Sequence, residues 1–137
     1  MKVEPYLFLE GRTEEALAFY TRALGAKVDM CMRYSDSPNP VPQQMLPPGG
    51  ASKIMHSSFI VGETRINASD GHVEGEASFA SFSLAITADG EADARRLFDG
   101  LASEGGEVRS PLQKTFFSPC FGMVRDRFGI GWMVLVR

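Results

Sequence analysis

Hydrophobic residues recur in the N-terminal third of the chain with two different periods. Apolar residues at steps of three and four predict an amphipathic helix over residues 13–24. The residues of this stripe are Ala16, Leu17, Tyr20, Ala23 and Leu24. Gly25 follows directly and is suited to ending the helix in a left-handed conformation. Alternating apolar and polar residues over 28–34 predict a half-buried strand, and the apolar run 5–9 predicts a shorter one before the helix.

A proline-rich segment and a hairpin follow. Residues 35–50 hold five of the eight prolines, which are incompatible with regular helix or sheet hydrogen bonding, so we expect a long loop there. Such a loop is either a mobile excursion or a lid over a site. Residues 53–61 and 64–68 are predicted strands, joined by a tight turn at Gly62-Glu63.

The same order of elements then begins again. We expect a strand over 79–87, a helix capped by Asp89 and ended by Gly105-Gly106, and strands over 107–110, 121–125 and 131–137. The buried stripe of the second helix is Ala94, Leu97, Phe98 and Leu101. A duplicated βαβββ unit explains this repetition. The predicted fold class is therefore α+β, a single domain over 1–137 with module one at about 3–69 and module two at about 78–137.

Composition narrows the classes of partner. With 137 residues and 44% hydrophobic content, the chain can bury one ordinary core. A net charge of -3 without a Lys/Arg run argues against nucleic acid and anionic membranes as partners. Glu4 and Glu10 interrupt the N-terminal apolar run, so we expect no signal peptide or membrane span and a cytoplasmic location. Cys31 and Cys120 lack metal-site spacing and are interpreted as reduced structural thiols.

The C-terminal run 111–134 carries the most specific motif. Its characteristic residues are Gln113, Thr115, Phe116, Phe121, Gly122, Val124, Asp126, Phe128, Gly129, Trp132 and Met133. This run resembles the PhnB-like branch of the glyoxalase/bleomycin-resistance/vicinal-oxygen-chelate (VOC) superfamily, although Phe117 stands where tryptophan is usual. Segments 5–9, 19–20, 32–34 and 54–56 fit the same group. The resemblance implies two modules with curved mixed sheets around a cavity, helices on the outer faces, and a homodimer.

Members of this group often bear the name 3-demethylubiquinone-9 3-methyltransferase. A Rossmann-type methyltransferase needs a glycine-rich turn between its first strand and helix, so that backbone N–H groups can approach the cofactor. The corresponding segment here is Glu10-Gly11-Arg12-Thr13. We therefore judge methyl transfer unlikely, and enzymatic activity of any kind is left open by the sequence.

Metal-dependent relatives imply four ligand positions, which fall here on Pro5, Ser81, Met133 and, within about two residues, Asn67. These residue types are poor ligands for the hard or borderline ions that such sites hold with histidine and carboxylates. We therefore expect no metal and no cofactor.

Strand alternation then sorts residues between two faces. The set expected beneath the helices is Tyr6, Phe8, Ile66, Ala68, Phe82, Leu84, Ile86, Trp132, Val134 and Val136. The set expected on the inner face is Pro5, Leu7, Leu9, Asn67, Ser69, Ser81, Ser83, Ala85, Gly131, Met133 and Leu135, joined by His56 and Ser58 from the third strand. The predicted ligand-binding residues are Leu7, His56, Ser58, Asn67, Ser81, Ser83 and Met133.

Three further features have alternative interpretations, and two have a single one. His56 is the best candidate for a catalytic group, because it titrates near neutral pH, or it is a hydrogen-bonded structural histidine. Arg33, sharing the non-core face with Cys31, contacts an anionic ligand or is a surface residue. His72 is expected to be solvated and Trp132 to lie in the core. The segment 113–117 forms the rim of the cavity or a dimer contact.

Three functions remain as hypotheses. The leading one is a metal-free VOC protein that binds a small molecule. The alternative is a VOC-type enzyme of the lyase, isomerase or oxygenase class, using His56 as a base or within a non-standard metal site. The third is an assembly module. The sequence does not identify a ligand.

Overall fold

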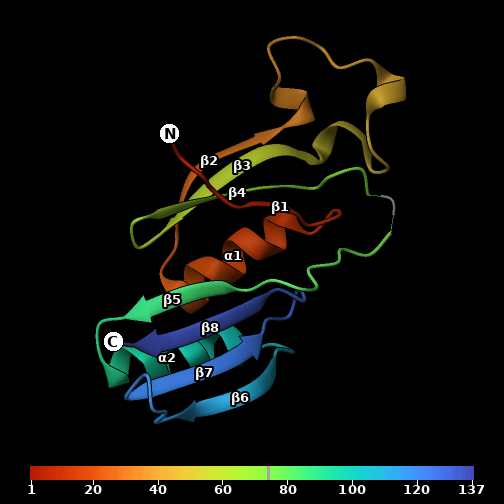
Figure 1. Ribbon diagram of the computed structural model, residues 1–137. Helices are drawn as coiled ribbons and strands as arrows, with labels where there is room; N and C mark the ends of the chain where they lie inside the picture. The colour runs from red at the N-terminus through yellow and green to blue at the C-terminus, as the bar shows by residue number, and fades with distance from the viewer. Residues whose placement is uncertain (74) are drawn as a thin grey trace. The chain divides into compact units, whose positions relative to one another are not determined.

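The computed structural model describes residues 1–73 and 75–137, which form two compact units, Met1–Ala77 and Ser78–Arg137 (Figure 1). Each unit contains a four-stranded mixed sheet and one α-helix in the order βαβββ. Neither sheet closes into a barrel. The predicted α+β fold with two βαβββ modules is therefore confirmed.

The elements of unit 1 are β1 (Tyr6–Phe8), α1 (Thr13–Leu24), β2 (Lys27–Arg33), β3 (Ile54–Val61) and β4 (Thr64–Ser69). Its sheet has the order β1-β4-β3-β2, with β1 parallel to β4 and the other pairs antiparallel. The apolar stripe of α1 is buried, and the ring of Tyr20 stacks on Phe59 of β3 at 5.4 Å between centroids. Gly25 ends α1 with φ 67°, as predicted.

The proline-rich segment contains only short 3-10 turns between β2 and β3. These turns are Tyr34–Asp36, Gln43–Met45 and Gly50–Ser52. The prediction of a loop over 35–50 is thus confirmed. Its role as a lid stays a prediction.

The elements of unit 2 are β5 (Leu84–Ala88), α2 (Glu91–Ala102), β6 (Glu107–Gln113), β7 (Cys120–Arg125) and β8 (Gly131–Val136). The order β5-β8-β7-β6, with β5 parallel to β8, repeats the topology of unit 1. The predicted stripe of α2 is buried, and Trp132 of β8 is only 2% exposed. The expectation that Trp132 lies in the core is confirmed.

Both predicted ends of α2 were misplaced. The N-cap is Gly90 rather than Asp89, and the cap position makes no side-chain hydrogen bond. Instead the Asp93 carboxylate accepts hydrogen bonds from the Asp89 N–H and from Arg96, and the bond from Arg96 lowers the pKa of Asp93. At the other end the helix stops at Ala102, before the two glycines, where the Ser103 hydroxyl donates to the Gly100 carbonyl oxygen.

A buried carboxylate joins three elements of unit 1. Asp70 follows β4 directly and is 2% exposed. Its Oδ1 accepts the N–H of Thr13, the first residue of α1, at 2.9 Å. Its Oδ2 accepts the N–H of Ile54, the first residue of β3, at 2.7 Å. Asp70 thereby pairs two backbone donors that burial would otherwise leave without an acceptor.

Replacing Asp70 with alanine is therefore expected to destabilise the protein by about 2–4 kcal/mol, because two buried N–H groups lose a charged acceptor. Urea unfolding followed by circular dichroism measures this loss. The matched control is Asp99→Ala, which removes an exposed carboxylate paired with Arg95 at 3.7 Å and should cost less than about 1 kcal/mol. Equal losses in the two variants would contradict the role given to Asp70.

Candidate functional site

The face of the unit 1 sheet away from α1 gathers polar and aromatic side chains. Tyr6 is in register with Asn67, and Asn67 with Ser58, so these three residues share one face. The Tyr6 hydroxyl lies 3.1 Å from Nδ1 of His56, and the two rings stack with centroids 5.6 Å apart. His56, Ser58 and Asn67 therefore lie on one surface, as the parity argument predicted for them.

The predicted parity of β1 was wrong. Tyr6 is 42% exposed, whereas Leu7 is 2% exposed and in register with the buried Ala68 on the α1 side. Phe8 is likewise exposed and Leu9 buried. A strand of three residues is too short for the alternation of apolar and polar residues to show which side chains face the core. Leu7 is thus removed from the candidate ligand-binding face, and Tyr6 rather than Pro5 is the β1 residue beside Asn67.

The predicted parity of β2 was also wrong, because two register shifts interrupt the strand. Met30 and Met32 are in register with Ser58 and His56 and lie on their face. Arg33 instead pairs with Glu14 of α1 at 2.7 Å and donates to the Ser52 carbonyl oxygen. The hydrogen bond to Glu14 raises the pKa of Arg33, and partial burial raises the pKa of the Cys31 thiol.

Polar groups on this face already have partners within unit 1. The Ser58 hydroxyl donates to Asp29, which also pairs with Arg65 at 3.1 Å. The Asn67 amide donates to the Pro5 carbonyl oxygen at 3.3 Å. The Tyr6–His56 pair adds a phenol and an imidazole, whose polar atoms can donate or accept hydrogen bonds to a bound molecule.

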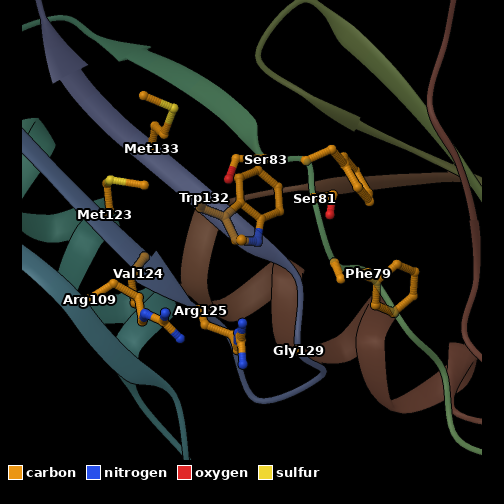
Figure 2. A pocket seen from close by; sticks show the side chains of 13 residues that line it. Phe79, Ser81, Ser83, Arg109, Met123, Val124, Arg125, Gly129, Trp132 and Met133 are labelled. Carbon is orange, nitrogen blue, oxygen red and sulfur yellow. The ribbon is translucent and has the colours of Figure 1, made fainter.

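Unit 2 contains a pocket of about 470 Å³ on the face of its sheet away from α2 (Figure 2). Thirteen side chains or backbone segments line it, from residues 79–83 and from strands β6, β7 and β8 with the turn before β8. Ser81, Ser83 and Met133 are the predicted ligand-binding residues that the structure brings together here. The lining residues that were not predicted as part of a site include Phe79, Phe82, Arg109, Met123 and Arg125.

Residues 79–83 were predicted as the start of a strand, but β5 begins only at Leu84. Phe82, expected beneath the helix, therefore escapes strand alternation, is exposed and lines the pocket. Ser81 has a φ of 69°, a left-handed conformation that costs a non-glycine residue about 1 kcal/mol or more and recurs at binding sites. This turn brings the serine hydroxyls to the pocket.

The close approach of Ser83 to β8 depends on Gly131. A Cβ at position 131 would lie 2.8 Å from the Ser83 hydroxyl oxygen. Glycine therefore permits the wall formed by 79–83 to lie directly against the first residue of β8. The wall and the strand then enclose the pocket between them.

Arg109 and Arg125 give the pocket its charge. Arg125 ends β7, in register with Glu107 of β6. Arg109 is the residue skipped by the register between Val108 and Ser110, and such a bulge redirects a side chain from strict alternation. Figure 2 draws both guanidinium groups below the Trp132 indole, with Ser83 above the indole and Ser81 to its right. Neither arginine was predicted as a site residue, because no face was assigned to residues 107–125 from the sequence.

Asp126 fixes the turn before β8 and the orientation of Trp132 by hydrogen bonds. Its Oδ2 accepts the indole N–H at 2.8 Å, while its Oδ1 accepts the N–H groups of Phe128 and Ile130 at 2.8 and 3.1 Å. The carboxylate is buried. One side chain therefore shapes the turn between β7 and β8 and orients the indole beside the pocket.

The segment 113–117 contributes no lining residue to this pocket. Phe116 and Phe117 lie in the connection between β6 and β7, where their rings make an edge contact with each other and the ring of Phe117 makes another with Phe121. Both side chains are exposed. The alternative of a dimer contact stays a prediction.

No group of three or more His, Cys, Asp or Glu side chains is arranged to hold a metal ion among residues 1–73 and 75–137. The positions opposite each other on β1 and β4 are Tyr6 and Asn67, and in unit 2 they include Met133 with Ala85 as its β5 neighbour. A phenol, an amide and a thioether do not make a site for hard or borderline ions. Across the same described ranges, no helix is long and apolar enough to cross a membrane.

Comparison with known proteins identifies the class. The fold matches a glyoxalase-related enzyme from Fulvimarina pelagi with a TM-score of 0.66 at 17% identity, over 100% of this chain and 88% of that one. The family model named 3-demethylubiquinone-9 3-methyltransferase matches residues 1–135, and this chain belongs to that family. The resemblance to PhnB-like proteins is confirmed, and the fold is shared with the glyoxalase-related enzyme.

Three relatives are similar over nearly their whole length. Protein YjdN of Escherichia coli K12 is 33% identical, over 99% of this chain and 95% of YjdN. The crystal structure of protein PA1353 from Pseudomonas aeruginosa has a TM-score of 0.83 at 36% identity, covering 100% and 98% of the two chains. The PhnB protein from Bacillus cereus, a putative 3-demethylubiquinone-9 3-methyltransferase, has a TM-score of 0.79 at 25% identity and full coverage of both chains.

Asp126→Asn is expected to destabilise the protein by about 1–3 kcal/mol, because the amide keeps one acceptor oxygen and its NH₂ group, a donor, cannot accept an N–H on the other side. Urea unfolding measures the loss, and the emission of Trp132 should shift with it. In a Trp132→Phe background the same change should cost less, because the indole donor is gone. An unchanged cost in that background would contradict the link between Asp126 and Trp132.

Proposed function

We propose that this chain is a small-molecule-binding member of the VOC superfamily that works without a metal, and that unit 2 holds its binding pocket. The supporting observation is the pocket of about 470 Å³, lined by Trp132, two methionines, two serines and two arginines. Ligand sites in proteins occupy roughly 300–1,000 Å³ and combine an apolar lining with a few polar groups. Ser81, Ser83 and Met133 are proposed to contact the ligand.

The metal-free part of the proposal rests on residue chemistry. Strand pairing puts Tyr6 beside Asn67 and Ala85 beside Met133, where metal-dependent relatives are expected to hold their ligands, and the other expected position, Ser81, precedes β5. Oxygen-binding ions of the kind used in such sites favour carboxylates and imidazoles, which are not the groups found there.

Methyl transfer is not part of the proposal. In the Rossmann-type fold the cofactor lies at the carboxyl ends of parallel strands beside a glycine-rich turn. Each sheet here has only one parallel pair, β1 with β4 or β5 with β8, and the turn before α1 contains the single glycine Gly11. The family name thus describes an activity for which these features offer no site.

The chain is further proposed to function as a single VOC domain, as a homodimer, and in the cytoplasm. The exposed rings of Phe116 and Phe117 suit a protein contact, which supports the dimer.

Ligand screening tests the binding function. Trp132 is the single tryptophan of the chain and lines the pocket, so a ligand should change both its fluorescence and the melting temperature. Ser83→Leu extends a larger side chain at the pocket wall and should weaken binding about tenfold or more, equivalent to roughly 1.4 kcal/mol. The control is Thr87→Leu, a similar change at an exposed position of β5 outside the pocket.

The outcomes of this screen are distinct. Weaker binding in Ser83→Leu with unchanged binding in Thr87→Leu supports the unit 2 pocket. Equal effects of the two changes, or no compound that shifts the melting temperature of the native chain, contradict it.

A catalytic role for unit 1 is the second candidate function. The observation in its favour is the contact between the Tyr6 hydroxyl and His56 Nδ1 at 3.1 Å. A hydroxyl bonded to one ring nitrogen selects the tautomer and leaves the other nitrogen to take or give a proton. Ser58 and Asn67 on the same face are proposed to orient the substrate. In this form the chain is a lyase, isomerase or oxygenase whose base is His56.

Turnover of compounds found in the screen, followed by mass spectrometry, tests this second function. A catalytic His56 predicts that His56→Ala lowers turnover about 100-fold or more and that Tyr6→Phe lowers it less. His72→Ala, which changes an exposed loop histidine, is the control. Turnover that survives in His56→Ala excludes the role of base. Stoichiometric zinc, manganese or iron in protein purified without chelators would contradict the metal-free proposal.

A further inference from the structure

We propose that the ligand of the unit 2 pocket is an amphipathic organic anion. Its carboxylate or phosphate group is placed at Arg109 and Arg125, and its apolar part against Met123 and Met133. This inference rests on the proposed binding function and adds the chemical class of the ligand.

The charge of the lining is the first support. Of the thirteen lining residues, the charged ones are Arg109 and Arg125, and none is a carboxylate. The whole chain has a net charge of -3, so the positive pocket is opposite in sign to the protein around it. A concave site lined by one sign of charge raises the local concentration of ligands of the other sign.

The two guanidinium groups come from neighbouring strands. Arg125 lies at the end of β7 and Arg109 at the bulge of β6, and these strands pair through Glu107 and Arg125. Guanidinium groups bind carboxylate and phosphate oxygens with two parallel hydrogen bonds, which fixes the orientation of the anion. Figure 2 draws both groups toward the same end of the pocket.

Both arginines are available to such an anion. In the described part of the chain, Arg125 forms no ion pair and its side chain is exposed. Arg109 is 3.8 Å from Glu107, and both of these side chains are about half exposed. An exposed pair at that distance is weak and easily exchanged for a ligand with better geometry.

The rest of the lining suits an apolar body with a polar edge. Met123 and Met133 are directly opposite each other on β7 and β8. Thioether side chains adapt to irregular apolar shapes and make favourable contacts with aromatic rings. Ser81 and Ser83 add hydroxyl groups that donate or accept. A simple inorganic anion would leave this apolar surface uncovered.

Isothermal titration calorimetry with matched probes tests the inference on the full chain. The pairs are 3-phenylpropionate with 3-phenylpropionamide and octanoate with octanamide, and 2-phenylethyl phosphate is the phosphate arm. We expect each anion to bind about tenfold more tightly than its neutral partner or more, and to weaken at higher ionic strength. Arg125→Gln and Arg109→Gln should each reduce the ratio between the anion and the amide several-fold while amide binding persists.

Arg95→Gln is the matched control, because Arg95 lies on the exposed surface of α2, paired with Asp99. It should leave the ratio unchanged. Tighter binding of 3-phenylpropionate or of the phosphate tells which anionic group the pocket takes. Equal affinity for anions and amides, or an anion preference that survives both pocket variants, overturns the inference while the binding function stands. If neither member of any pair binds, both the function and the inference fail.

Discussion

The buried carboxylate of Asp126 is the interaction on which the unit 2 pocket depends. It accepts two backbone N–H groups of the turn between β7 and β8 and the indole N–H of Trp132. The turn sets where β8 begins, and β8 supplies Gly131, Trp132 and Met133 to the pocket. Burial makes each of these hydrogen bonds obligatory, because an N–H without an acceptor in the core costs about 1–3 kcal/mol. The same carboxylate therefore stabilises the fold and shapes the site.

Asp70 has a comparable role in unit 1. Its carboxylate, just after β4, accepts the backbone N–H groups of the first residues of α1 and β3, so that one side chain pairs donors from two other elements. In both units a buried aspartate directly follows a strand and accepts backbone N–H groups, from α1 and β3 in the case of Asp70 and from the adjoining turn in the case of Asp126. The two contacts are not equivalent in sequence, because Asp70 follows the last strand of its module and Asp126 the second to last.

Irregular backbone determines the chemistry of the site. Arg109 lies at the bulge of β6, and Ser81 has a left-handed conformation in the segment before β5; both residues line the pocket. The glycine at 131 allows the wall carrying Ser83 to approach β8. Regular strands supply the apolar remainder through Met123 and Met133. The family relationship establishes the architecture, whereas the side chains at these few positions determine which ligand the pocket can bind.

Several features of the protein could be predicted from sequence because they are local. The periodicity of the two helices, the left-handed glycine after α1 and the alternation in β3, β4 and β8 agree with the structure. Each of these patterns extends over enough residues for burial of one face to be visible in the sequence. The core position of Trp132 followed from the same argument, since its neighbours alternate regularly.

Only the tertiary structure decided the faces of β1 and β2 and the composition of the pocket. β1 is three residues long, so its side chains are assigned by pairing with β4 rather than by any pattern of their own. Register shifts in β2 and β6 reverse the alternation, and a bulge depends on how two strands fit together rather than on either strand alone. Arg109 and Arg125 line one pocket because β6 pairs with β7, with Glu107 in register with Arg125. The sequence by itself therefore determined the modules and their helices, while strand pairing decided which side chains face the ligand.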